Sequence, residues 1–139
     1  LFLASTVLGA DLAVRGPQEG TWELDAVKLP NEPNYPEPKK EKKGRRLLMV
    51  TATHFCWVQY RFEKGPDSGK AETTMVAGGS YTVQGDTIKE KVEFASAKLL
   101  PDVGTIFVIT KSRFDGKNWY RTFTSPDGEK EDQRWVRIK

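Results

Sequence analysis

The feature that most constrains the fold of this chain is a succession of short segments with alternating hydrophobicity, separated by tight turns. No segment of normal helical length carries apolar residues at the spacing of an amphipathic helix. Turn-forming residues at 84–85, 115–116 and 125–128 separate neighbouring segments. The pattern predicts eight strands, at 20–28, 46–51, 54–62, 72–83, 87–94, 105–114, 117–124 and 130–138.

Strands joined in sequence by short turns form an antiparallel meander, and eight strands can close on themselves so that no edge is left unpaired. We therefore predict an all-β fold, an eight-stranded antiparallel up-and-down β-barrel. A β-sandwich is the alternative, because the strand pattern does not distinguish a barrel from a sandwich. The length of 139 residues corresponds to one domain.

The counts of metal-binding residues exclude several kinds of site. The chain has one Cys and one His, so it has neither a disulfide framework nor a metal centre built from several Cys or His side chains. We expect no bound metal and no cofactor. A bilayer-spanning helix needs about 20 apolar residues, and the longest apolar run is far shorter, so no transmembrane segment is expected.

The positive charge of the chain is local. Residues 37–46 contain six basic and two acidic side chains, whereas the rest of the chain sums to −1. A nucleic-acid-binding protein usually spreads Lys and Arg along a face or a helix, so no nucleic-acid partner is expected. The cluster lies in a loop, 29–46, with four prolines, which no strand or helix tolerates. We interpret this loop as a lid or rim, solvated or in contact with an anionic partner.

The N-terminal residues 1–10, LFLASTVLGA, resemble the apolar part of a secretory signal and end in small residues. Residues 1–17 are therefore interpreted as a signal remnant, which predicts export to the periplasm or the medium. An ordered arm that packs on the domain is the alternative. The barrel domain is expected at 18–139.

Alternation also predicts which side chains face the interior. On 87–94 one set is polar, whereas Glu90 is the odd member of the apolar set formed with Ile88, Val92 and Phe94. A buried carboxylate needs a partner, and Arg121 is the expected one. On the other strands, the predicted inward positions are His54, Cys56, Val58, Tyr60, Phe62, Tyr81, Ile106, Val108, Thr110, Ser112, Phe114, Trp119, Arg121 and Phe123.

Gly20-Thr21-Trp22 on the first strand, with an Arg near the end of the last, resembles the signature of the lipocalins and their calycin relatives. The segments 53–60, 78–96 and 134–138 are similar to bacterial, mostly secreted lipocalin-like families of unknown function. The resemblance covers about residues 18–139, and the loop 29–46 departs from it. It implies a small-molecule pocket and a Trp22 that closes one barrel end beneath Arg137 or Arg134.

These observations favour a protein that binds a small hydrophobic or amphipathic ligand in a barrel cavity, as a monomer or a dimer. Such pockets combine apolar walls with a few orienting polar groups. The candidate ligand-binding residues are His54, Tyr60, Tyr81, Glu90, Thr110, Ser112, Trp119 and Arg121.

An enzyme that performs acid–base chemistry in the same cavity is the alternative, with Glu90 or His54 carrying the proton. A third possibility is an interaction protein with a filled core. The pair Glu90–Arg121 is either structural or a ligand anchor. A metal site of His54, Cys56 and Glu90 and a nucleophilic Cys56 are further alternatives.

Overall fold

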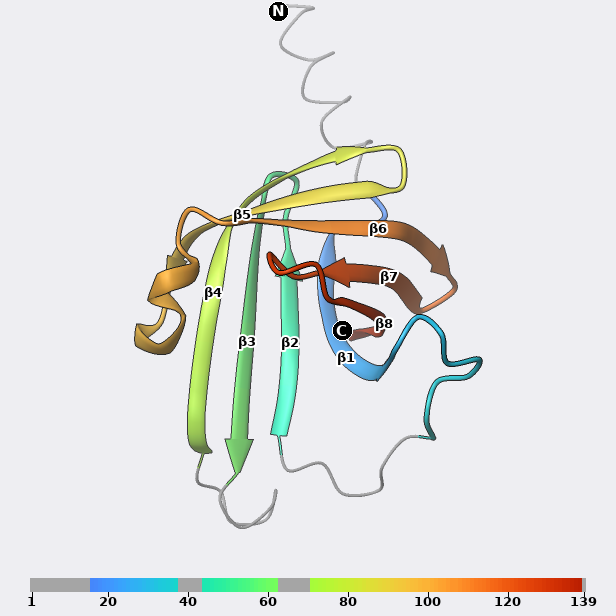
Figure 1. The fold of residues 1–139 in the computed structure, drawn as a ribbon, viewed down its shortest axis with the longest axis horizontal. Helices are drawn as coiled ribbons and strands as arrows, with labels where there is room; N and C mark the ends of the chain where they lie inside the picture. Colours follow the sequence, from blue (N-terminus) through green and yellow to red (C-terminus); the bar gives the residue numbers. More distant parts are fainter. Residues whose placement is uncertain (1–15, 38–43, 63–70, 139) are drawn as a thin grey trace, which may run out of the picture.

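The chain forms the predicted eight-stranded barrel (Figure 1). The structure, a computed structural model, describes residues 16–37, 44–62 and 71–138. The strands are β1 (Gly20–Lys28), β2 (Gly44–Val50), β3 (His54–Phe62), β4 (Ala71–Gln84), β5 (Thr87–Ala95), β6 (Ile106–Asp115), β7 (Asn118–Thr124) and β8 (Lys130–Ile138).

Every strand pairs antiparallel with its neighbours in sequence, and β8 pairs with β1 to close the barrel. The meander therefore places the connections β1–β2, β3–β4, β5–β6 and β7–β8 at one end, which we call the open end. The other connections and residues 16–19 lie at the opposite end, which we call the closed end. A 3-10 helix, η2 (Ala97–Asp102), occupies the β5–β6 connection.

Aromatic side chains fill the closed half of the barrel. Trp22 has no exposed surface, and its ring centre lies 5.2 Å from that of Trp119 and 5.8 Å from that of Phe114. The guanidinium of Arg137 lies 4.2 Å from the centre of the Trp22 ring, and Arg137 donates hydrogen bonds to the carbonyls of Pro17 and Glu19. The prediction that Trp22 closes a barrel end is confirmed. Arg137 covers it, whereas Arg134 pairs with Asp25.

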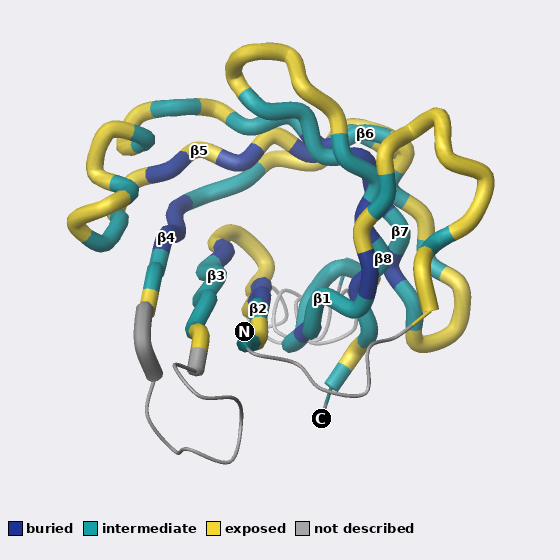
Figure 2. Tube along the Cα trace, turned by 60° about the horizontal axis from the view of Figure 1, so that its bottom comes forward, coloured by how far each residue is buried: buried dark blue, intermediate teal, exposed yellow. Residues whose placement is uncertain are grey.

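Figure 2 shows buried and exposed positions alternating along several strands, as a barrel wall requires. On β5, Ile88, Glu90 and Val92 are buried and the intervening Lys89 and Lys91 are exposed, as predicted, whereas Phe94, expected on the same face, is 49% exposed. The register of β4 with β5 shifts between the adjacent glycines Gly78 and Gly79. A Cβ on Gly79 would collide with the carbonyl oxygen of Lys91.

The facing predicted for β3 is wrong. Phe55 is buried and Trp57 packs against the core, whereas His54 is exposed. Both alternating sets of this strand are rich in apolar side chains, so polarity does not choose between them. The register with β2 decides which set faces inward, because it places Phe55 opposite Val50 and Trp57 opposite Leu48. Cys56, Val58 and Tyr60 consequently lie on the outer face; the side chain of Phe62 is outside the described residues.

The facing predicted for the first half of β6 is also wrong. Ile109 is fully buried opposite Ile88, so Ile106, Val108 and Thr110 point outward. The register then shifts between Thr110 and Arg113, and Lys111 adopts a φ of 52°. This extra residue reverses the alternation. The predicted inward positions after it, Ser112 and Phe114, are therefore correct: Trp119 donates to Ser112, and Phe114 stacks on Trp119.

The described part of the proline-rich loop, 29–37, is anchored to the outer face of the barrel. The Tyr35 ring lies 5.9 Å from the Tyr120 ring, with the Lys28 ammonium 5.4 Å and the Arg134 guanidinium 5.1 Å from its centre. The strand after this loop begins at Gly44, two residues earlier than predicted. Residues 38–43, with most of the basic cluster, and the N-terminal segment 1–15 lie outside the described residues.

Among the described residues, no helix is long and apolar enough to cross a membrane.

Candidate functional site

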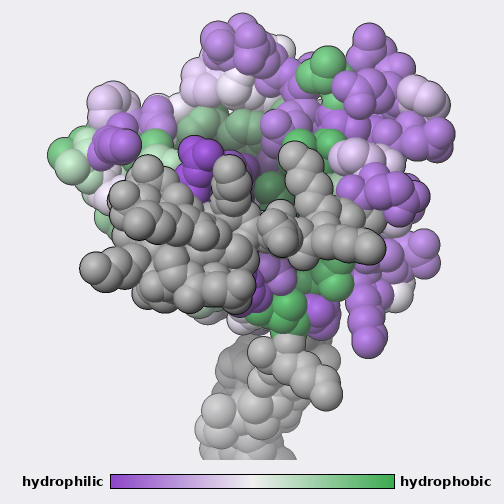
Figure 3. Space-filling model, turned by 90° about the horizontal axis from the view of Figure 1, so that it is seen from below, coloured by the Kyte–Doolittle hydropathy of each residue, from purple (hydrophilic) through white to green (hydrophobic). Residues whose placement is uncertain are grey.

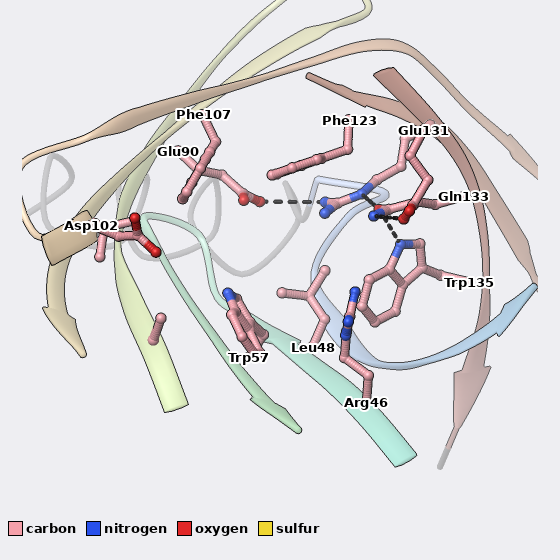
Figure 4. Close-up of a pocket in the computed structure, with 13 residues that line it drawn as sticks. Arg46, Leu48, Trp57, Glu90, Asp102, Phe107, Phe123, Glu131, Gln133 and Trp135 are labelled. Carbon is pink, nitrogen blue, oxygen red and sulfur yellow. Dashed lines mark hydrogen bonds and ion pairs between the residues drawn. The ribbon is translucent and has the colours of Figure 1, made fainter. Parts of the chain in front are cut away.

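The open half of the barrel contains a cavity of about 200 Å³ (Figure 4). Its apolar walls combine aliphatic and aromatic side chains from seven strands, β2 to β8, and its polar groups include two arginines and three carboxylates. It is lined by Arg46, Leu48, Trp57, Ala77, Glu90, Val92, Asp102, Phe107, Arg121, Phe123, Glu131, Gln133 and Trp135. Seen from the open end, the described surface is largely hydrophilic, with hydrophobic patches between the polar residues (Figure 3).

A buried ion pair crosses this cavity. Arg121 Nη1 donates to Glu90 Oε2 at 3.3 Å, and both residues are 5% exposed. The predicted inward facing of Glu90 and its contact with Arg121 are confirmed. Burial raises the pKa of the Glu90 carboxyl above its ordinary value, although the charge and hydrogen bond of Arg121 act in the opposite direction. One long hydrogen bond does not offset the loss of water around the carboxylate.

Gln133 on β8 connects this pair to the open end. Its Oε1 accepts hydrogen bonds from Arg121 Nε and from Trp135 Nε1, both at 2.9 Å. Its Nε2 donates to Glu131 Oε1 at 3.1 Å. The amide therefore orients the Arg121 guanidinium, which also lies about 5 Å from the centres of the Trp119 and Trp135 rings. The result is a polar chain through an otherwise apolar wall.

A second arginine, Arg46 on β2, lines the cavity nearer the open end. Its Nε and Nη2 both donate to Gln59 Oε1, at 3.1 Å and 2.8 Å, and its guanidinium lies 5.7 Å from the centre of the Trp57 ring. Burial lowers the pKa of Arg46, and the charge of Glu131 acts in the opposite direction. Within residues 16–37, 44–62 and 71–138, Arg46 is in no ion pair.

Of the eight candidate ligand-binding residues, the structure brings Glu90 and Arg121 to the cavity. Three others lie inside the closed half. Trp119 belongs to the aromatic cluster, Ser112 accepts the hydrogen bond of its indole at 2.9 Å, and Tyr81 donates to the carbonyl of Thr51. These three side chains complete the filled end of the barrel.

The remaining three candidates lie on the outer face. His54 is exposed beside Thr53, whose hydroxyl is 2.7 Å from His54 Nδ1. Tyr60 pairs across strands with Arg45, and Thr110 with Thr122, both at outward positions. His54 therefore cannot share a proton with a substrate in the cavity.

The three residues of the alternative metal site, His54, Cys56 and Glu90, do not lie together in the structure. The first two lie on the outer face of β3, whereas Glu90 is inside. Among the described residues, no group of three or more His, Cys, Asp or Glu side chains is placed to hold a metal ion.

Several cavity residues were missed by the sequence prediction, and for β8 a usable signal existed. Arg137 or Arg134 was expected over Trp22, and alternation from Arg137, the residue that the structure places there, puts Trp135, Gln133 and Glu131 inside as well. No comparable signal marks Asp102, which reaches the cavity from η2 (Figure 4).

In sequence comparisons, no family model matches the chain and no curated protein matches it significantly.

Proposed function

We propose that this protein binds a small, largely apolar molecule in the open half of its barrel. The observation that carries the proposal is the unfilled cavity of about 200 Å³, walled by apolar side chains and crossed by the Glu90–Arg121 pair. A purely structural barrel of this size would be filled by side chains, as the closed half is. Ligand sites combine apolar walls with few polar groups, and the modest volume favours a ligand smaller than the usual drug-sized molecule.

A relationship to the lipocalins is part of this proposal. The eight-stranded closed barrel agrees with it without being specific to it. The stacking of Arg137 on Trp22, which follows Gly20, supports it further. Export is also a proposal, and it rests on the signal-like sequence of residues 1–10.

The proposal is tested with octanol as a neutral probe, by calorimetry and by tryptophan fluorescence. Ala77 is buried and lines the cavity, so Ala77→Leu reduces the cavity volume and is expected to weaken octanol binding at least several-fold. The matched control is Ala97→Leu, the same change at an exposed position of η2. Equal octanol affinity of the two variants, or no saturable binding to the wild type, would refute the proposal.

A second candidate function is acid–base catalysis, favoured by Glu90 alone. A carboxyl group inside a cavity, with a pKa raised by burial, is a feature of many general acids and bases. Chromatography coupled to mass spectrometry of a bound molecule distinguishes the two functions. An enzyme changes the mass or the isomer of its ligand during incubation and loses this ability in Glu90→Gln, whereas a carrier releases the ligand unchanged.

A further inference from the structure

The cavity has a hydrogen-bond donor for which the described residues supply no acceptor. Three of the four indole nitrogens are used: Trp22 donates to Gln18, Trp119 to Ser112 and Trp135 to Gln133. Trp57 Nε1 has no acceptor among the described residues. No buried side-chain nitrogen or oxygen of these residues lacks a partner, so the Trp57 N–H is not sealed in protein.

Arg46 lines the same wall as Trp57. Figure 4 shows the two residues on neighbouring strands along the same side of the cavity, with the indole nitrogen at the end of the ring toward Asp102. The register places Arg46 opposite Gln59, two residues along β3 from Trp57, so both side chains project from the inner face. The two donors are therefore diagonal neighbours on one wall.

The two cavity arginines differ in their partners. Arg121 is neutralised by Glu90 at 3.3 Å. Arg46 bonds to a neutral amide oxygen, and the Glu131 carboxylate lies beyond ion-pair distance and accepts a hydrogen bond from Gln133. A guanidinium that has lost part of its water without gaining a counter-ion is unfavourable. A bound carboxylate would supply that counter-ion with charge-assisted hydrogen bonds.

We propose that the ligand is a small amphipathic carboxylate, whose anionic end binds Arg46 and the Trp57 indole N–H and whose apolar end lies among Val92, Phe107 and Phe123. This inference rests on the proposed function, since it assumes that the cavity binds a ligand. It selects Arg46, rather than the neutralised Arg121, as the anchor.

Arg46 also lines a second hollow, of about 320 Å³, beside β1, β2 and β3. The strands β1 and β2 pair over four positions, Gly20–Glu23 with Leu47–Val50, so Arg46 lies beyond the paired part of this wall. An anionic group at Arg46 therefore need not be drawn into the deepest part of the barrel. The carboxylates of Asp102 and Glu131 line the same cavity and oppose an anion, which makes an amine the competing ligand class to exclude.

The test compares octanoate, octanol and octylamine by calorimetry at neutral pH and low salt. These probes share one chain length and differ in the charge of the head group. For the wild type we expect octanoate to bind tightest, with an advantage over octanol that decreases as salt is added. Arg46→Gln should weaken octanoate roughly tenfold to a hundredfold, the effect of losing a charge-assisted hydrogen bond, and should leave octanol nearly unchanged.

Two further variants make the test specific. Arg134→Gln is the matched control, because Arg134 is paired with Asp25 on the outer face and lines neither the cavity nor the second hollow. It should leave octanoate binding unchanged. Trp57→Phe keeps an aromatic ring and removes the N–H donor, and should weaken octanoate severalfold with little effect on octanol.

A measurement on the wild type keeps the proposal falsifiable if Arg46→Gln fails to fold. The carboxyl of octanoate labelled with carbon-13 should titrate at a lower pKa when bound than when free, because the guanidinium favours the ionised form. An unchanged or raised pKa refutes the carboxylate anchor. So does equal octanoate affinity in Arg46→Gln and the wild type, or tightest binding of octylamine. If octanol binds as tightly as octanoate, the anchor is wrong and the binding function survives; if no probe binds, both fail.

Discussion

Arg121 Nη1 and Glu90 Oε2 meet 3.3 Å apart inside the barrel, and the two members of this pair have unequal support. Arg121 also donates to Gln133 and packs between the Trp119 and Trp135 rings. Glu90 has Arg121 as its one charged partner among the described residues. Removing the charge of Arg121 should therefore change the stability of the protein differently from removing the charge of Glu90.

We predict that Arg121→Met destabilises the protein by about 3–5 kcal/mol at neutral pH, because it leaves a buried carboxylate without a counter-charge. Glu90→Gln should change stability by less than about 1 kcal/mol, since the amide oxygen can still accept from Arg121 and the guanidinium keeps Gln133 and two indole faces. Urea denaturation of both variants measures the free energies of unfolding. An equal loss in both would show that the pair acts symmetrically.

The raised pKa of Glu90 predicts a pH dependence of stability. Between the ordinary carboxyl pKa, about 4.3, and the raised folded-state pKa, the folded protein binds more protons than the unfolded chain, so stability falls as pH rises through this window. The free energy of unfolding of the wild type relative to Glu90→Gln should therefore decrease from about pH 4 upward. A difference that increases with pH would mean that Arg121 lowers the pKa of Glu90 instead.

Trp22 is predicted to stabilise the closed end. Trp22→Ala should cost about 3–5 kcal/mol, the range for truncation of a buried aromatic side chain, because the ring is fully buried against Trp119 and Phe114. Trp57→Ala is the comparison: Trp57 borders the cavity and is half-buried, so its loss should cost less stability and more ligand binding. Thermal unfolding followed by circular dichroism measures both variants, and equal losses would contradict the division into a filled and an unfilled half.

The barrel itself was predictable, because period-two strands, short turns and the absence of amphipathic helices leave few other arrangements. The position of Glu90 was predictable for a related reason. On β5 the polar and apolar sets are cleanly separated, so one carboxylate among apolar neighbours stands out.

The rest of the site depends on information that alternation does not contain. On β3 both faces are largely apolar, and the register with β2 decides that Trp57 rather than Tyr60 is inside. Arg46 was predicted at the boundary between the basic loop and a strand, because four lysines precede it within seven residues, whereas it lies on the inner face of β2. On β6 the bulge at Lys111 reverses the facing, and no sequence signature of glycine or asparagine marks it.

That bulge supplies the last prediction. Lys111 has a φ of 52°, in the left-handed region that β-branched residues strongly disfavour. Lys111→Val should cost about 1–2 kcal/mol, whereas Lys111→Gly should be neutral or slightly stabilising because glycine adopts this conformation without strain. Lys89→Val is the matched control: Lys89 is also exposed on the outer face, on the neighbouring strand, where a β-branched residue suits extended backbone. The stabilities of the three variants are compared by their denaturant midpoints. If Lys111→Val is as stable as Lys89→Val, Lys111 is not in a left-handed bulge. The reversal of facing that points Phe107 and Ile109 into the barrel would then be wrong as well.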